Sequence, residues 1–287
     1  MNVLSHAKTN LFLKVLRRRQ DGFHEIETLI SRIALADEIE ITPNPNEEFT
    51  LSCSDPSVPT NQENLVLRAA ETLKEAAPNC LPGLHFHLEK HIPHGAGLGG
   101  GSSNAATVLR TLRAAYHLPL DDEQLRHLAA KLGSDIPAFL LDAPSLCRGR
   151  GEQISLWPTK LPALPILLLK PSFGVSTPWA YSQWSVSQEL PNISYSAQSH
   201  QHLPGLNIVN DLERPVFQKY IHLAQLKRWL LGQNEVEVAL MSGSGSTMLA
   251  IPRQEASIQK LREKCEATWG ADLWLQATEL LPTASID

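Results

Sequence analysis

A glycine-rich segment, residues 93–106, carries the clearest chemical signal in the chain. Five glycines fall within the seven residues from Gly95 to Gly101, and two serines follow. Because glycine has no Cβ, its amide N–H can approach a ligand closely and its backbone can adopt conformations that other residues resist. An apolar-periodic segment begins directly afterwards, and a helix N-terminus there would add free N–H groups and the positive end of a dipole. The segment therefore predicts an anion site, and phosphate is the anion most often bound in this way.

Glycine-rich phosphate loops of several types compete for this segment. The P-loop of NTPases ends in Gly-Lys-Ser/Thr, whereas Gly101 is followed by Ser102 with no lysine, so that reading fails. The pattern G-x-G-x-x-G of dinucleotide-binding folds is met by residues 95–100, but it expects an acidic residue at the end of a second strand about 20 positions later. Asp121 and Asp122 stand at that distance and open a helix-like run instead. A flexible Gly/Ser linker would need an unstructured flank, whereas helical spacing continues through Leu109.

Two charged residues could carry proton or charge chemistry beside a bound phosphate. Asp135 precedes the apolar residues 136–139, where an aspartate either caps a helix or, if held near a substrate, accepts a proton from an alcohol. Lys8 lies in an otherwise uncharged strand-like segment, where a lysine either reaches toward solvent or pairs with a carboxylate. A second glycine turn, residues 242–246, lies between apolar strand-like segments and could equally be an ordinary hairpin loop.

Composition limits the classes of function that fit. With 287 residues, 43% hydrophobic and 19% charged, the chain can bury a substantial core as one large or two ordinary domains. A net charge of −5 argues against nucleic acid as the main partner. The longest apolar run is far too short to span a bilayer, and the N-terminus shows no export signal, so we expect a cytoplasmic location and no membrane partner. The four cysteines lie at least 27 positions apart (Cys53 to Cys80), which fits reduced thiols rather than a metal motif.

The elements that would position these residues mix strands and helices without strict alternation, which predicts an α+β protein. Predicted strands cover residues 5–16, 39–41, 84–88, 166–169, 236–241, 246–251 and 272–278. Predicted helices cover residues 64–77, 103–116, 122–132, 135–142, a short segment after Pro178, 210–217, 221–231 and 253–267. Proline-rich residues 157–165 suggest a domain boundary near residue 157, and the polar stretch 185–205 is expected to be a loop.

Five segments together resemble motifs of the GHMP kinases, over nearly the whole chain and in the family's order. They are residues 7–13 (AKTNLFL), 21–24 (DGFH), 97–106 (GLGGGSSNAA), 132–137 (LGSDIP) and 241–246 (MSGSGS). Such a series is far more specific than any one of them. The resemblance implies a two-domain α+β fold: a ribosomal-protein-S5-like ATP-binding domain, residues 1–157, and a ferredoxin-like α/β domain, residues 158–287. It places the active site in the cleft between them.

By this resemblance Asp135 would take the proton from the acceptor hydroxyl, and Lys8 would orient Asp135 and offset charge at that oxygen. ATP would be bound by the glycine loop and two further residues: Asn64, Lys90, Pro93, His94, Gly95, Ala96, Gly97, Leu98, Gly99, Gly100, Gly101, Ser102 and Ser103. Asn64 and Lys90 match positions near its adenosine half. The family uses Mg²⁺ with ATP, and either Ser102 or Ser103 could touch the ion, but the metal ligands are not identified by the sequence.

The acceptor residues are also carried over from the resemblance: Asn10, Phe23, His24, Thr177, Tyr181, Ser242, Gly243, Ser244 and Gly245. His24 would read the edge of a cytosine, and Phe23 and Tyr181 would stack on its two faces. Phe23 replaces the family's usual tyrosine, so stacking should survive while a phenol hydrogen bond is lost. Asn10 would place the methylerythritol hydroxyls, and Thr177 would lie near the diphosphate.

The implied reaction is transfer of the γ-phosphate of ATP to the 2-hydroxyl of a methylerythritol that carries a cytidine diphosphate. The alternatives are another small alcohol (homoserine, mevalonate or a sugar) and a nucleotide-binding protein without transfer activity. Lys8 and Asp135 are both present, which argues against the last of these. We expect ATP and the small-molecule acceptor to be the partners, and the chain to be a monomer or a weak homodimer.

Overall fold

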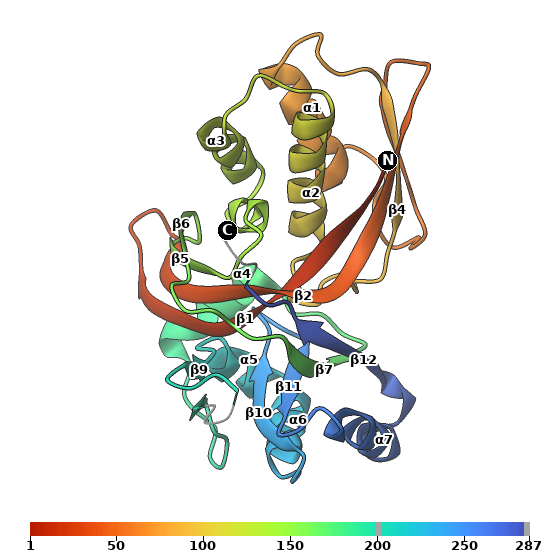
Figure 1. The fold of residues 1–287 in the computed structure, drawn as a ribbon. Coiled ribbons are helices and arrows are strands. Elements are labelled where there is room, and N and C mark those ends of the chain that lie inside the picture. Colours follow the sequence, from red (N-terminus) through yellow and green to blue (C-terminus); the bar gives the residue numbers. More distant parts are fainter. Residues whose placement is uncertain (199–201, 284–287) are drawn as a thin grey trace. The chain divides into compact units, whose positions relative to one another are not determined.

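A computed structural model describes residues 1–198 and 202–283, and the chain in it divides into two compact units (Figure 1). Unit 1 comprises residues 1–7, 35–94 and 99–142, and unit 2 comprises residues 8–34, 95–98 and 143–287. The long strands β1 (Asn2–Arg18) and β2 (His24–Pro43) each begin in one unit and end in the other. These units are defined by contacts and each combines several segments of the chain. They therefore do not test the domain boundary near residue 157, which stays a prediction.

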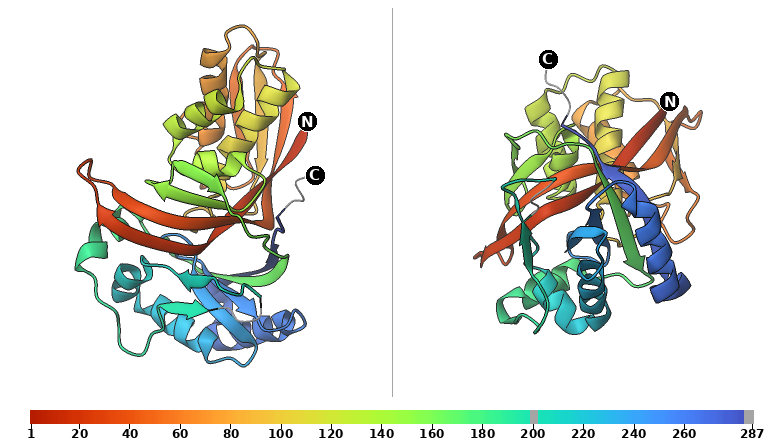
Figure 2. Two further views of the ribbon diagram at one scale, coloured as in Figure 1. Left: turned by 60° about the vertical axis from the view of Figure 1, so that its left-hand side comes forward. Right: turned by 60° about the horizontal axis from the view of Figure 1, so that its bottom comes forward.

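Unit 1 packs helices against a small sheet. The second half of β2 pairs antiparallel with β4 (Leu84–Glu89), and β3 (Phe49–Cys53) pairs with β4 in parallel. The helices are α1 (Leu65–Ala76), α2 (Gly100–Ala115), α3 (Asp122–Leu132) and the short 3₁₀ helix η1 (Ile136–Leu140). In Figure 1 and in both views of Figure 2 the helices stand on one side of β3 and β4.

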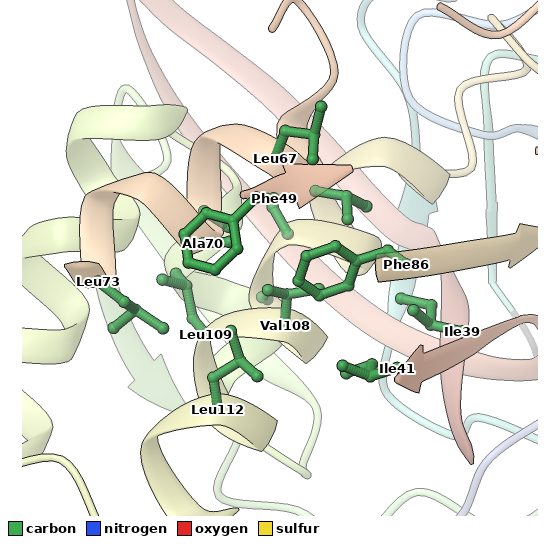
Figure 3. Close-up of a cluster of buried hydrophobic side chains, with 14 of the residues drawn as sticks. Ile39, Ile41, Phe49, Leu67, Ala70, Leu73, Phe86, Val108, Leu109 and Leu112 are labelled. Atoms are coloured by element: carbon green, nitrogen blue, oxygen red, sulfur yellow. The ribbon is translucent and has the colours of Figure 1, made fainter. Parts of the chain in front are cut away.

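The alternation of β4 explains which face of this sheet is covered. Leu84, Phe86 and Leu88 are buried, whereas His85 and His87 between them are half-exposed. Figure 3 shows Phe86 in a cluster with Ile39 and Ile41 from β2 and with side chains of the two long helices. Burial of this apolar face is the main stabilising term for the unit, and it fixes α1 and α2 over the sheet.

Unit 2 contains a larger antiparallel sheet. Its strands run in the order β10 (Val236–Met241), β11 (Met248–Pro252), β7 (Leu164–Pro171), β12 (Leu273–Leu280) and then the first half of β2. That half of β2 also pairs with β5 (Ser145–Gly149), which pairs with β6 (Gln153–Leu156). A separate short pair joins β8 (Ser196–Gln198) to β9 (Asn207–Val209).

The helices of unit 2 share its second hydrophobic core. They are α4 (Thr177–Gln183), α5 (Glu213–Lys219), α6 (Ile221–Leu231), α7 (Ser257–Trp269) and two 3₁₀ turns, η2 (Trp184–Val186) and η3 (Gly270–Asp272). Leu167 and Leu169 of β7 pack with Phe217, Leu226 and Leu261 from three of these helices. All four cysteines are free thiols. Over the parts of the chain that the structure describes, no helix has the length and apolarity needed to cross a membrane.

Most predicted elements occur, with shifted ends. The predicted helix 135–142 is instead the five-residue 3₁₀ helix η1, and the predicted strand 39–41 is the end of the 20-residue β2. The stretch 185–205, expected to be a loop, contains most of η2 and all of β8, while residues 199–201 lie outside the described residues. Residues 210–212 do not belong to a helix; they form a turn before α5 that matters below.

Candidate active site

The glycine loop alternates left-handed glycines with buried apolar anchors. Gly95, Gly97 and Gly99 have φ of +63°, +76° and +70°, a region that residues with a Cβ rarely adopt, while Ala96 and Leu98 between them are buried. Helix α2 begins at Gly100 rather than at residue 103, so the backbone N–H groups of its first turn belong to the loop. No side chain caps this N-terminus. The result is a row of backbone donors suited to an anion.

Asp135 directs its carboxylate at this loop within unit 1. It stands at the N-cap position of η1 but makes no cap hydrogen bond; instead its Oδ1 accepts a hydrogen bond from Ser102 Oγ at 3.0 Å. Of the two roles left open by the sequence, helix capping therefore does not apply. A half-buried carboxylate beside the first turn of α2 is placed where it could take a proton.

The two serines of the loop have different surroundings. Ser103 is buried and its hydroxyl donates to the carbonyl of His6 at 2.6 Å, with Ser5 Oγ at 2.8 Å. Ser102 is half-buried and bonds only to Asp135 among the hydrogen bonds described. Of the two hydroxyls, the one on Ser102 is therefore better placed to meet a ligand.

Lys8 reaches the other part of the loop within unit 2. Its Nζ donates to Asn10 Oδ1 at 2.6 Å and to the carbonyl of Gly97 at 3.0 Å, and its own backbone N–H donates to the carbonyl of Leu98 at 3.0 Å. Asn10 is fixed in turn because its Nδ2 donates to Thr28 Oγ1 at 2.7 Å. The side chain of Lys8 is thus buried, and these hydrogen bonds orient it rather than leaving it extended into solvent. Asp135 belongs to unit 1, so its pairing with Lys8 stays a prediction.

The turn between β10 and β11 packs directly on the loop. Ser242 Oγ donates to the carbonyl of Gly97 at 3.1 Å and accepts from Thr9 Oγ1 at 3.2 Å. A Cβ on Gly97 would lie 2.3 Å from the carbonyl oxygen of Ser242, and one on Gly243 would lie 3.2 Å from Lys8 Nζ. Glycine is required at both positions by this close approach as well as by positive φ. Three sequence motifs far apart in the chain therefore meet within unit 2.

Buried polar side chains that the sequence analysis missed hold this turn. Asn210 Nδ2 donates to the carbonyls of Met241 and Gly243, both at 2.7 Å. Glu213 Oε1 accepts from the backbone N–H of Met241 at 2.9 Å, and its other oxygen pairs with Lys227 Nζ at 2.5 Å. Burial raises the pKa of Glu213, and Lys227 opposes that rise. The sequence predicted a helix over residues 210–217 and gave no sign that Asn210 and Glu213 hold a turn. The partners of Asn210 lie 31 and 33 residues away, outside any local pattern.

His24 opens β2 in an aromatic setting. Its ring centroid lies 5.5 Å from that of Tyr181 and 6.0 Å from that of Trp184. Burial, and then the nearby positive charge of Arg18, lower the pKa of His24, which favours the neutral imidazole. A neutral imidazole offers one donor and one acceptor.

Phe23 and Thr177 complete the acceptor residues predicted from sequence. Phe23 is 54% exposed, and the guanidinium of Arg150 lies 4.7 Å from its ring centroid. Thr177 Oγ1 is hydrogen-bonded to Ser244 Oγ at 2.6 Å, which joins the start of α4 to the turn after β10. The structure thus groups His24 with Tyr181, and Thr177 with Ser244; the binding roles of these residues remain predictions.

Asn64 and Lys90 both have structural partners in unit 1. Asn64 caps α1, with Oδ1 accepting from Val66 N at 2.9 Å and Nδ2 donating to the carbonyl of Pro59 at 2.7 Å. Lys90 Nζ is paired with the fully buried carboxylate of Asp37. Contacts of either residue with the adenosine half of ATP remain predictions.

Asp37 itself was missed by the sequence analysis. Its Oδ1 accepts from the backbone N–H groups of His91 and Ile92 at 2.9 and 2.8 Å. The carboxylate therefore fixes the segment that enters the glycine loop. No local pattern marks it, since its partners are more than 50 residues away.

Comparisons with known proteins agree with this arrangement. The family described as GHMP kinases N terminal domain matches residues 64–143. The chain is 40% identical over 285 residues, 98% of this chain and 97% of the relative, to a 4-diphosphocytidyl-2-C-methyl-D-erythritol kinase of Methylacidiphilum infernorum. It is 36% identical to a protein of the same name from a Synechococcus strain, with coverage of 98% and 94%.

Solved structures show the same fold. A crystal structure of 4-(cytidine 5'-diphospho)-2C-methyl-D-erythritol kinase matches with a TM-score of 0.77 at 34% identity, covering 98% of this chain and all of the other. The Methanococcus jannaschii mevalonate kinase matches with a TM-score of 0.68 at 12% identity and covers 98% of each chain, which speaks for the fold alone. The α+β GHMP kinase fold expected from the sequence is confirmed.

Proposed function

Because this chain belongs to the family of 4-diphosphocytidyl-2-C-methyl-D-erythritol kinases, within the GHMP kinases, we propose that it phosphorylates the 2-hydroxyl of that cytidyl alcohol with ATP. The product is the 2-phosphate, an intermediate of non-mevalonate isoprenoid biosynthesis. ATP is the donor expected for a GHMP kinase. The observation that carries the proposal is the pair of contacts on one glycine loop: Asp135 through Ser102, and the Lys8 ammonium through the carbonyl of Gly97.

In the proposed reaction the acceptor oxygen attacks the γ-phosphorus, the bond from that phosphorus to the β–γ bridging oxygen breaks, and ADP leaves. Asp135 takes the hydroxyl proton as the new O–P bond forms. Lys8 offsets the negative charge that gathers at the reacting oxygens, an effect that is strong where water is excluded. The loop N–H groups and the first turn of α2 hold the phosphates of ATP.

Magnesium would be held jointly by the phosphates of ATP and by residues of the glycine loop. Within the described ranges 1–198 and 202–283, no three His, Cys, Asp or Glu side chains gather where they could hold a metal ion. The Ser102 hydroxyl, half-buried and beside Asp135, is the protein oxygen best suited to add to a shell of phosphates and waters. When bound, the ion would neutralise phosphate charge.

Recognition of the acceptor rests on unit 2. We assign the cytosine edge to His24, its faces to Tyr181 and Phe23, the diphosphate end to Thr177 and the polyol hydroxyls to Asn10. The turn of residues 242–245 lies against the glycine loop and would border the reacting phosphate. We further propose that the enzyme acts in the cytoplasm as a monomer or weak homodimer, with a domain boundary near residue 157.

The first test replaces Asp135. Asp135→Ala should fold with an unchanged melting temperature and lose transfer to the cytidyl alcohol, measured by formation of ADP that depends on acceptor. Asp122→Asn is the matched control, because it removes an exposed carboxylate of the same unit that pairs with Arg113 on the surface. Full turnover by Asp135→Ala would refute the base assignment. The proposed acceptor would be wrong if the wild type phosphorylated homoserine, mevalonate or galactose faster than the cytidyl alcohol.

A further inference from the structure

Trp184 contacts His24 although no motif marks it. It is the first residue of η2 and lies three positions after Tyr181. The planes of the Trp184 and His24 rings cross at 80°, an edge-to-face contact, whereas Tyr181 lies at 31° to the imidazole. Edge-to-face pairs have a preferred geometry, so Trp184 restricts the rotation of the imidazole plane in a way that an aliphatic side chain would not.

Arg214 of α5 lies over the indole ring of Trp184. Its guanidinium carbon is 5.7 Å from the Trp184 ring centroid. A guanidinium at this distance from an indole ring is attracted to it by a cation–π interaction. Arg214 follows Glu213 directly, and Glu213 is fixed by Lys227 and by the backbone of Met241, which anchors the start of α5.

Two polar atoms in this group have no hydrogen-bond partner among the residues described: Trp184 Nε1 and Arg214 Nε, both buried. A buried donor without a partner costs free energy, on the order of 1–3 kcal/mol. The indole is therefore held by its ring contacts and not by a hydrogen bond. Because the indole contacts the guanidinium of Arg214 and the imidazole of His24, a change in its orientation would act directly on His24.

We propose that Trp184 is a positioning residue for the cytosine of the acceptor, acting through the ring of His24, and that Arg214 holds Trp184 in place. The inference rests on the proposed function, since it takes His24 as the group that reads the base. On this proposal Trp184 contributes to the affinity for the acceptor. It contributes neither to the affinity for ATP nor to the rate of phosphoryl transfer.

The test compares Trp184→Leu and Trp184→Phe with wild type. The leucine variant should raise KM for the cytidyl alcohol about three- to tenfold, the range expected for loss of one aromatic contact, with kcat and KM for ATP within about twofold. The phenylalanine variant keeps an aromatic edge and should restore most of the affinity. Arg214→Met should raise the same KM less than Trp184→Leu does, and Arg214→Lys should restore it.

Trp269→Leu is the matched control. Trp269 also lies edge-on to a histidine, His222 at 4.9 Å and 85°, and its Nε1 is likewise buried without a partner, but it belongs to α7. Its loss should lower the melting temperature and leave acceptor KM unchanged.

A double-mutant cycle decides whether Trp184 acts through His24. In a His24→Ala background Trp184→Leu should change acceptor KM by less than about twofold, because residues acting through one another are non-additive. Full additivity, or equal increases in KM for ATP and for acceptor, would overturn the inference. If wild type shows no transfer to the cytidyl alcohol, it is the proposed function that fails. In that case tritiated CMP binding to the same variants still tests Trp184.

Discussion

Ser102 and Ser103 are neighbours in sequence, yet the helix turns them into different environments. Because α2 starts at Gly100, Ser103 points its hydroxyl at the carbonyl of His6 and Ser102 points its own at Asp135. The sequence offered either serine as a ligand of the metal ion. The buried hydroxyl of Ser103 has a structural role, whereas the half-buried hydroxyl of Ser102 is accessible to a ligand.

Replacing each serine by alanine should separate stability from activity. Ser103→Ala leaves buried polar groups of His6 and Ser5 with one partner fewer and should lower the free energy of unfolding by about 1–3 kcal/mol, with KM for ATP unchanged. Ser102→Ala should leave stability within about 0.5 kcal/mol and lower kcat. Urea unfolding and steady-state kinetics on both variants measure this; the reverse pattern would contradict it.

The neutral state of His24 gives acceptor binding a pH dependence. Because burial and Arg18 lower its pKa below the ordinary 6.5, the folded protein binds the proton less readily than the unfolded chain does. Folding stability from this group is complete above 6.5 and declines as pH falls through 6.5 toward the lowered value. KM for the acceptor should be constant from pH 8 down to about 6.5 and rise below the lowered pKa.

His24→Asn is the control for this profile. Its amide keeps a donor and an acceptor but does not titrate, so the rise of acceptor KM at low pH should disappear in that variant. A rise of the same size in His24→Asn would show that another group is responsible.

At the scale of elements, Asp37 links β2 to the segment between β4 and the glycine loop. Asp37→Asn keeps an oxygen for the N–H groups of His91 and Ile92 but leaves the Lys90 ammonium buried without its charge partner. Breaking a buried pair in this way costs about 3–5 kcal/mol. We expect a lower melting temperature and a higher KM for ATP, because a neutral amide oxygen holds the segment before the loop less strongly than a carboxylate does.

The double variant Asp37→Asn, Lys90→Met removes the stranded charge and should recover part of the stability lost by Asp37→Asn. Thermal unfolding of the single and double variants tests this. If the double variant is less stable than Asp37→Asn alone, the ion pair is not the reason for the loss.

Local patterns predicted most elements but missed the middle of β2 and several of the shortest strands. The helical spacing of residues 64–77 and 122–132 predicts α1 and α3 almost to the residue. Residues 28–31 of β2 are buried without alternation, so the sequence revealed only the alternating end of that strand, residues 39–41. The strands β3, β5 and β6 have four or five residues each and carry too little pattern to be found.

The same distinction applies to the site. Glycine spacing and short motifs located the loop, Lys8 and Asp135, because each is a local signal. Asp37, Asn210 and Glu213 act through partners 14 to 55 residues away, and such partners are not encoded in any short window. Trp184 was missed for the same reason, since its contact with His24 joins distant segments.

At the scale of the whole molecule, the two units are interleaved along the chain. Residues 8–34 precede most of unit 1 but pack with unit 2, where Leu13, Val15 and Ile26 share a core with Phe217. Residues 26–30 of β2 also pair with β5. Neither unit is therefore a continuous piece of sequence.

A fragment of residues 1–142 should show this interleaving. It keeps all of unit 1 but removes the partners of residues 8–34. In hydrogen exchange, amides of residues 84–89 and 104–115 should stay protected, while those of residues 8–34 exchange rapidly. Equal protection of residues 8–34 in the fragment and in the full chain would contradict the division.

Hydrogen bonds from Asn210 hold the turn of residues 242–245, and Glu213, paired with Lys227, holds the residue before it, Met241. Exchanging aliphatic residues of the unit 2 core for others of similar size should therefore disturb this turn less than losing one of these polar residues would. We expect engineered variants that accept a different alcohol to keep these three polar residues and to vary the residues around them.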